Sequence, residues 1–163
     1  MDIKKLTNDI NNTVAESLKQ EPESIKKIYR GEIPSDAGIG TQFFSTLVFS
    51  LIYTLTLGQH MLYHLIDSLH NSKISLDDFK DQVYYFLGHG FNSSNFLGYV
   101  LDPKIGEYNA LIVENLSKIN DRQEMYDLLG AYCTYLNLMH TWLHVRFPWG
   151  LGVAFPKAME PKI

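Results

Sequence analysis

Two pairs of histidines, each spaced four residues apart, are the side chains of this chain best suited to chemistry. The pairs are His60/His64 in LGQHMLYHLID and His140/His144 in LMHTWLHVRF, and both stretches are apolar and helix-like. Residues at positions i and i+4 of an α-helix lie on one face, about one turn apart. Each pair therefore presents two imidazoles side by side, and two such helices together can offer four nitrogens to one metal ion.

Asp67 extends the first pair to the pattern His60-x3-His64-x2-Asp67. Its carboxylate is placed either to ligate a metal or to accept a hydrogen bond from the outer N–H of His64, which would fix the tautomer of that ring. Imidazole and carboxylate ligands suit zinc or iron. The sequence therefore predicts a mononuclear divalent metal site whose ligands are His60, His64, His140, His144 and Asp67.

Other metal centres fit the sequence less well. A ferritin-like di-iron site requires Glu-x-x-His motifs, and none occurs in this chain. A haem held by one histidine from each helix leaves the second member of each pair unexplained. Glu114 is a further candidate carboxylate, because it is the only acid among the apolar residues of its segment LIVENL. The competing interpretation is that all four histidines are ordinary packed or surface residues.

Three more side chains are candidates for contact with a substrate. Tyr53 and Asn137 share the helix faces of the first and second histidine pairs, and Arg146 follows the second pair closely enough to bind a substrate carboxylate. An arginine at a helix C-terminus is also favoured by the helix dipole alone. With a metal, we expect a hydrolase or hydratase that activates a bound water. Without one, the alternatives are a small-molecule pocket with histidine acids, bases or hydrogen-bond donors, and an interaction module without catalysis.

The apolar periodicity predicts an all-α bundle of about five or six helices that positions these residues. Two long, apolar, histidine-bearing helices are expected at its centre, because their apolar residues surround most of the circumference. The segment FNSSNFLGYVLDP is expected to hold one or two helical turns. The predicted helices cover residues 2–20, 23–30, 37–70, 76–88, 106–118 and 121–145.

The topology decides whether the two histidine pairs meet. In an up-and-down bundle the two long helices run antiparallel, and the pairs would lie near opposite ends, about 20 Å or more apart. Convergence needs helices that are roughly parallel or steeply crossed. The irregular segment from His89 to Lys104 is long enough to provide the crossover.

Composition predicts a single helical domain over residues 1–163. It comprises amphipathic N-terminal helices in 1–34, a core bundle in 35–146 and an irregular apolar tail in 147–163. Hydrophobic residues make up 45% of the chain and charged residues 20%, a balance typical of a folded globular protein. The lone Cys133 excludes an intrachain disulfide.

The charge pattern bears on which partners the protein binds and on where in the cell it is expected. The net charge is −4 and the basic residues are scattered, so no nucleic-acid partner is expected. Residues 37–66 and 128–145 carry no formal charge and are formal candidates for membrane spans, but their histidines, amides and hydroxyls favour helices buried in protein. The N-terminus has no apolar leader, so a cytoplasmic location is expected. The apolar tail and the aromatic content are compatible with a homo-oligomer.

Overall fold

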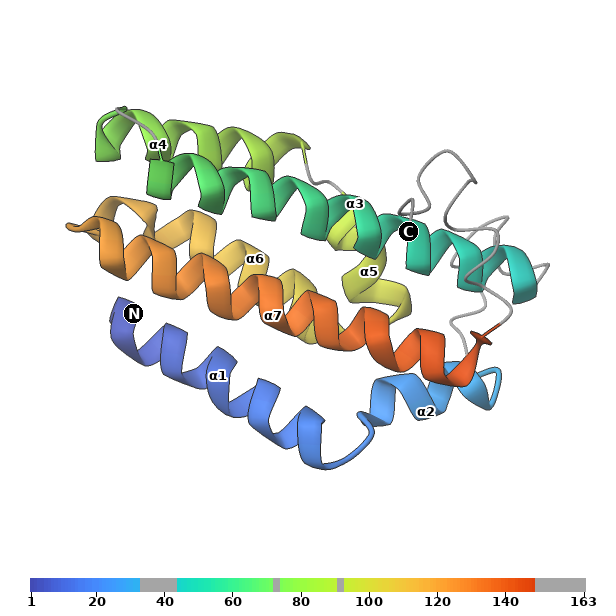
Figure 1. The fold of residues 1–163 in the computed structure, drawn as a ribbon. Helices are drawn as coiled ribbons and strands as arrows, with labels where there is room; N and C mark the ends of the chain where they lie inside the picture. Colours follow the sequence, from blue (N-terminus) through green and yellow to red (C-terminus); the bar gives the residue numbers. More distant parts are fainter. Residues whose placement is uncertain (33–43, 72–73, 91–92, 149–163) are drawn as a thin grey trace.

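The computed structural model describes residues 1–32, 44–71, 74–90 and 93–148. Within these segments there are seven α-helices and no strand, which confirms the predicted all-α class (Figure 1). The predicted start of the first long helix at 37–43, the side chain of His89 and the tail beyond Pro148 lie outside what is described. The helices are α1 (Ile3–Lys19), α2 (Glu23–Tyr29), α3 (Phe44–Asn71), α4 (Leu76–Val83), α5 (Ser93–Val100), α6 (Pro103–Asn115) and α7 (Arg122–Arg146).

Acidic and hydroxyl side chains begin four of these helices. Asp2, Ser75, Asp102 and Asp121 each accept a hydrogen bond from a backbone N–H in the first turn that follows, which satisfies a donor with no partner inside the helix. Helix α6 therefore begins at Pro103 rather than near residue 106 as predicted. Asp102 caps it, and proline is well tolerated in a first turn because its missing N–H would have had no helical partner.

Helix α7 lies between α1 and α3 (Figure 1). It runs antiparallel to α3, because Arg122 at its start donates to the Leu69 carbonyl while His140 near its end contacts Thr56. It runs parallel to α1, where the indole N–H of Trp142 donates to the Ser17 carbonyl at 2.9 Å. Because both flanks are covered, the buried residues of α7 surround most of the helix. They include Met125, Leu128, Leu129, Tyr132, Cys133, Tyr135, Leu136, Met139 and Leu143.

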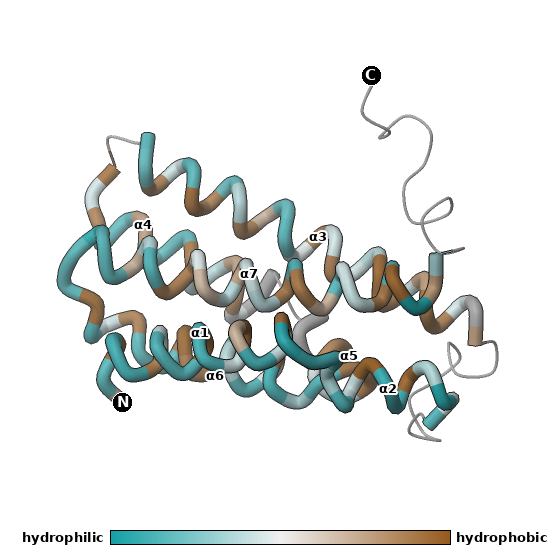
Figure 2. The backbone as a smooth tube through the Cα atoms, turned by 60° about the horizontal axis from the view of Figure 1, so that its bottom comes forward, coloured by the Kyte–Doolittle hydropathy of each residue, from teal (hydrophilic) through white to brown (hydrophobic). Residues whose placement is uncertain are grey.

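Among the residues that the structure describes, helix α3 is covered on one side only. Its fully buried leucines recur at one-turn or two-turn spacing, at Leu47, Leu51, Leu55 and Leu62, and face the core. The opposite side exposes about half of each of four large side chains, Tyr53, Leu57, Met61 and Tyr63. Figure 2 shows how apolar α3 is compared with the more polar α1. The apolar character of α3 therefore exceeds what its core-facing side alone requires.

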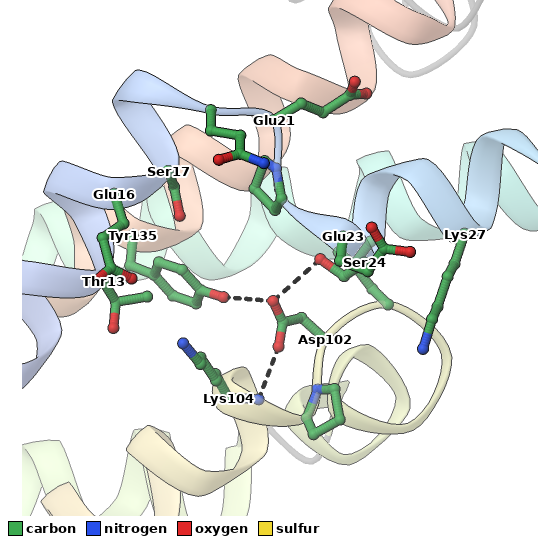
Figure 3. Close-up of a pocket in the computed structure, with 14 residues that line it drawn as sticks. Thr13, Glu16, Ser17, Glu21, Glu23, Ser24, Lys27, Asp102, Lys104 and Tyr135 are labelled. Atoms are coloured by element: carbon green, nitrogen blue, oxygen red, sulfur yellow. Dashed lines mark hydrogen bonds between the residues drawn. The ribbon is translucent and has the colours of Figure 1, made fainter.

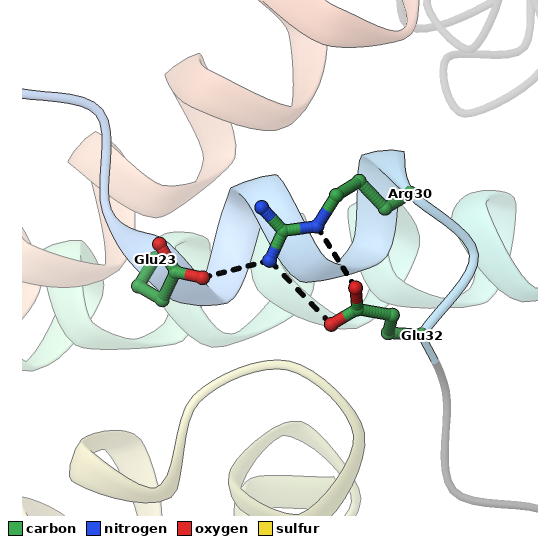
Figure 4. A network of polar contacts seen from close by, with 3 residues as sticks. All are labelled: Glu23, Arg30 and Glu32. Atoms are coloured by element: carbon green, nitrogen blue, oxygen red, sulfur yellow. Dashed lines mark hydrogen bonds and ion pairs between the residues drawn. The ribbon is translucent and has the colours of Figure 1, made fainter.

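Helices α5 and α6 lie behind α3 and α7, whereas α2 lies beside the end of α7 (Figure 1). A π-helical segment, Tyr84–Gly90, continues α4, and the amide of Asn109 on α6 donates to the Leu87 carbonyl within it. A 3-10 turn, Leu116–Lys118, follows α6. Directly after α2, the exposed Arg30 binds Glu23 at 2.7 Å and Glu32 at 2.9 Å (Figure 4). Exposed ion pairs of this kind contribute at most about 1 kcal/mol each.

Helices α3 and α7 contain the described parts of the two candidate membrane spans. Across the described segments, no helix combines the length and the apolarity that a membrane crossing requires.

Candidate functional site

His60 and His64 lie together on the exposed face of α3. Their Nε2 atoms are 3.2 Å apart, and the two rings meet edge to face with centroids separated by 4.6 Å. They line a surface hollow of about 320 Å³ with Tyr63 and Asp67. The Asp67 carboxylate also accepts a hydrogen bond from the Asn71 amide at 2.8 Å. The first predicted pair is thus formed, and its surroundings are largely solvent.

His140 and His144 lie half-buried on α7, with their Nε2 atoms 3.0 Å apart. His140 Nε2 is also 3.1 Å from Thr56 Oγ1 on α3. Because the Thr56 hydroxyl donates to the Ile52 carbonyl at 2.8 Å, its oxygen is left to accept, which favours the His140 tautomer with a proton on Nε2. Burial, with a smaller effect of the neighbouring His144, lowers the pKa of His140 to about 4, so this imidazole is neutral at physiological pH.

The four imidazoles form two separate pairs rather than one cluster. His140 lies level with Thr56, one turn before His60 on α3, so the pairs are much closer along the helix axes than the predicted opposite ends. Even so, the described residues contain no group of three or more His, Cys, Asp or Glu side chains placed to hold a metal ion. His60, His64 and Asp67 are exposed on α3, and it is Thr56, one turn before His60, that contacts His140 on α7. Metal binding by these residues stays a prediction.

The three predicted substrate contacts lie in different surroundings. Tyr53 and Asn137 are exposed on α3 and α7. Arg146 forms an ion pair with Glu21, and its guanidinium lies 5.2 Å from the centre of the Tyr29 ring. The hydrogen bond from Arg146 holds the pKa of Glu21 below its ordinary value. Arg146 thus ties the end of α7 to the α1–α2 connection, and substrate contact by any of the three residues stays a prediction.

A polar cleft of about 420 Å³ lies where the α1–α2 connection meets the α5–α6 connection and α7 (Figure 3). We call it the Asp102 cleft, after the carboxylate at its centre. The residues that line it and carry charge or a hydroxyl are Thr13, Glu16, Ser17, Glu21, Glu23, Ser24, Lys27, Asp102, Lys104 and Tyr135.

Three donors hold the buried Asp102 carboxylate. One oxygen accepts from the Tyr135 hydroxyl at 2.6 Å and from the Ser24 hydroxyl at 3.1 Å, and the other accepts from the backbone N–H of Lys104 at 2.9 Å. Burial, reinforced by the neighbouring Asp102, raises the pKa of Tyr135 far above its ordinary value, so the phenol stays protonated and donates. Donors of this kind offset the cost of burying a charged group.

Apart from Asp102, the charged residues of the cleft are three acids, Glu16, Glu21 and Glu23, and two amines, Lys27 and Lys104. Among the described residues, Glu16 forms no ion pair. Arg146 binds Glu21 and Arg30 binds Glu23, so both carboxylates are partly neutralised. Within the described segments, Lys27 and Lys104 form no ion pair, and both side chains are exposed. The cleft thus offers two ammonium groups beside a fixed carboxylate, which suits a ligand that carries both charges.

Cys133 does not add a nucleophile to either region. It lies buried in α7, and burial raises the pKa of its thiol to about 11, so the reactive thiolate is scarce at neutral pH.

The sequence patterns did not predict this cleft. The Asp102-Pro103 step was a recognisable helix start, since aspartate and then proline is typical of a cap and a first helical position. The convergence of Ser24, Asp102 and Tyr135 had no comparable signal, because the three lie far apart along the chain and share no spacing rule.

Comparison with known proteins adds a family and a solved relative. A family model described as "Cucumopine synthase C-terminal helical bundle domain" matches residues 3–145. The solved structure described as "Structure of McbB in complex with tryptophan" is similar with a TM-score of 0.78 and 26% identity, over 93% of this chain and 48% of that chain. This chain thus spans about half the length of the McbB chain. No match was found among curated proteins.

Proposed function

Because the chain belongs to the family of cucumopine synthase C-terminal helical bundle domains, we propose that it is a helical domain that binds a small molecule in the Asp102 cleft. The ligand class is an amino acid or a similar molecule that carries an amino and a carboxylate group. The tryptophan in the McbB structure belongs to this class, and it supports the choice.

The observation that carries the proposal is the pairing of opposite charges in one cleft of suitable size. Asp102 uses three hydrogen bonds, and a carboxylate has room for about four, so one position is available for a ligand ammonium. Lys27 and Lys104 can receive the ligand carboxylate. The volume of about 420 Å³ lies within the range of small-ligand pockets.

The proposal concerns binding and needs no metal. The Asp102 cleft shares no lining residue with the hollow of His60 and His64. The proposed function therefore differs from the metal-dependent hydrolase or hydratase predicted from the histidines. It agrees with the alternative of a metal-free small-molecule pocket, but places that pocket elsewhere in the fold.

Isothermal titration calorimetry with L-tryptophan, tryptamine and indole-3-propionate tests the charge requirement. Tryptamine lacks the carboxylate and indole-3-propionate lacks the amine. We expect L-tryptophan or another free amino acid to bind, and the analogue lacking either charge to bind about ten-fold more weakly, the effect of losing one charged hydrogen bond.

Lysine variants locate the site. Lys27→Ala and Lys104→Ala should each weaken amino-acid binding several-fold, whereas Lys4→Ala, an exposed lysine of α1 outside the cleft, should leave it unchanged. Failure of every amino acid to bind at millimolar concentration, or binding that is insensitive to both cleft lysines, would exclude the proposal.

Self-association is a second candidate function, and the half-exposed Tyr53, Leu57 and Met61 of α3 favour it. Light scattering over a range of protein concentrations should then detect a dimer that Leu57→Gln weakens. A monomer at all concentrations would count against this candidate.

A further inference from the structure

We propose that His60 and His64 alone form a two-imidazole chelate for one late first-row transition-metal ion, without His140 or His144. This site has two protein ligands instead of the five predicted from the sequence. It shares no residue with the Asp102 cleft.

The distance between the two Nε2 atoms already suits a chelate. With metal–nitrogen bonds of about 2.0–2.1 Å, nitrogens 3.2 Å apart subtend an angle of about 100° at the metal. That angle lies between those of square and tetrahedral coordination. Both rings would present an unprotonated Nε2, which requires the Nδ1–H tautomer in each. Small rotations of two exposed side chains are enough to aim both lone pairs at one ion.

The surroundings of the pair admit a cation. Both rings are exposed and line the hollow of about 320 Å³, so an ion reaches them from solvent and water completes its coordination. Asp67 lines the same hollow and adds a negative charge on the same face. It is not counted as a ligand, because the described residues hold no three-ligand group.

The second pair has the same spacing and a different environment, which makes it the matched control. Chelation there would break the hydrogen bond of 3.1 Å between His140 Nε2 and Thr56 Oγ1, in addition to the contact between the two imidazoles that either pair would lose. The ion would also enter a half-buried position, where losing part of its hydration shell costs free energy. We therefore assign the site to α3 and not to α7.

The ligand set also selects the ion. Imidazole nitrogens prefer Cu²⁺, Ni²⁺ and Zn²⁺, whereas Mg²⁺ and Ca²⁺ require oxygen ligands. Cu²⁺ should bind most tightly of the divalent first-row ions, following the usual order of stability.

Calorimetric titration of the untagged full chain with CuCl₂, NiCl₂, ZnCl₂ and MgCl₂, in a buffer that does not bind metals, tests the proposal. We expect one Cu²⁺ per chain, weaker Ni²⁺ and Zn²⁺ binding and no Mg²⁺ binding. The electron paramagnetic resonance spectrum of the Cu²⁺ complex should show coupling to two imidazole nitrogens.

Single variants then assign the ligands. His60→Ala and His64→Ala should each weaken Cu²⁺ binding by about ten-fold or more, because one ligand of the chelate is lost. His140→Ala should keep wild-type Cu²⁺ affinity, with circular dichroism to verify that each variant is folded. The proposal is overturned if Cu²⁺ fails to bind, if both α3 variants bind it normally, or if His140→Ala weakens binding as much as they do. Amino-acid binding at the Asp102 cleft would survive all three failures.

Discussion

The hydrogen bond from Tyr135 is the shortest of the three that hold the Asp102 carboxylate. It is short, at 2.6 Å, buried, and made to a charged acceptor. Tyr135→Phe removes the donor and leaves the carboxylate under-solvated, so the free energy of unfolding should fall by about 1.5–3 kcal/mol.

Tyr132 provides the matched control for that change. It is equally buried, but its hydroxyl makes only long contacts, at 3.3 Å to Ile105 and 3.4 Å to Asn109. Urea unfolding followed by circular dichroism should give a smaller loss for Tyr132→Phe than for Tyr135→Phe. Equal losses would mean that the Asp102 carboxylate does not depend on this donor.

His140 should make stability depend on pH in the mildly acidic range. Its pKa is about 4 in the folded state against an ordinary value of 6.5, so between these values the unfolded chain binds a proton that the folded chain does not. The free energy of unfolding should therefore fall as pH drops from 6.5 to 4. The loss should be on the order of 1–2 kcal/mol after allowance for the partial exposure of the ring.

Urea unfolding at several pH values measures this dependence. His140→Gln cannot take up the proton, so its stability should change less with pH over the same range than that of the wild type. Identical pH profiles for the two proteins would contradict the effect of burial on His140.

For single residues, sequence spacing correctly predicted the contacts within each histidine pair. It did not predict whether each pair would be buried or exposed. The i,i+4 rule correctly brought His60 to His64 and His140 to His144, because helix geometry alone decides which side chains are neighbours. It could not decide which face of α3 would be covered, since apolar residues such as Leu57 and Met61 lie on the exposed side as well.

Among the elements, the crossing of α5 and α6 depends on a residue without a side chain. A Cβ added at Gly98 would lie 3.1 Å from the backbone nitrogen of Gly106 and 3.2 Å from its Cα. Backbone atoms cannot rotate away, so Gly98→Ala should push the two helices apart and lower the free energy of unfolding by about 1–3 kcal/mol.

Gly130 of α7 is the control, because a Cβ added there meets nothing within 4 Å. Gly130→Ala should raise the free energy of unfolding by about 0.5–1 kcal/mol, the usual gain from replacing glycine inside a helix. Thermal unfolding of the two variants should thus move the midpoint in opposite directions. A stabilising Gly98→Ala would contradict the close crossing of α5 and α6.

Elements were the most predictable level of this fold. Helices α1, α2 and α7 begin and end within about two residues of the predicted limits, because periodicity and capping are local. Helix α5 was expected as one or two turns, and its eight residues make about two. Its Gly98 lowers helix propensity, and the reason for that glycine is its contact with Gly106. That contact belongs to the packing and not to the local sequence.

For the whole molecule, the histidine pairs and the Asp102 cleft differ in how much they depend on the packing of the helices against one another. Each pair needs one helix only, so its existence follows from the sequence. The cleft needs α2, α6 and α7 in a definite arrangement, with Ser24, Asp102 and Tyr135 contributed from distant positions. A single sequence does not show how segments far apart along the chain align with one another in space. For this reason the cleft could not be predicted.

Continuity of the core predicts how the whole molecule unfolds. A single cluster of buried apolar residues runs from Ile3 on α1 to Phe147 after α7, so the described part of the chain should unfold as one cooperative unit. Trp142, whose indole bonds to Ser17, reports on the α1–α7 contact. In a Trp149→Phe background, its fluorescence and far-UV circular dichroism should share one urea midpoint.

Ile10→Ala separates this expectation from independent detachment of α1. Ile10 is fully buried on α1, so its truncation should lower the free energy of unfolding by about 2–5 kcal/mol. If α1 is part of the same unit, both midpoints should fall together, because loss of its packing destabilises every helix at once. A fluorescence midpoint that falls while the circular dichroism midpoint stays in place would mean that α1 leaves α7 before the rest unfolds, and the single-domain prediction over residues 1–163 would then be wrong.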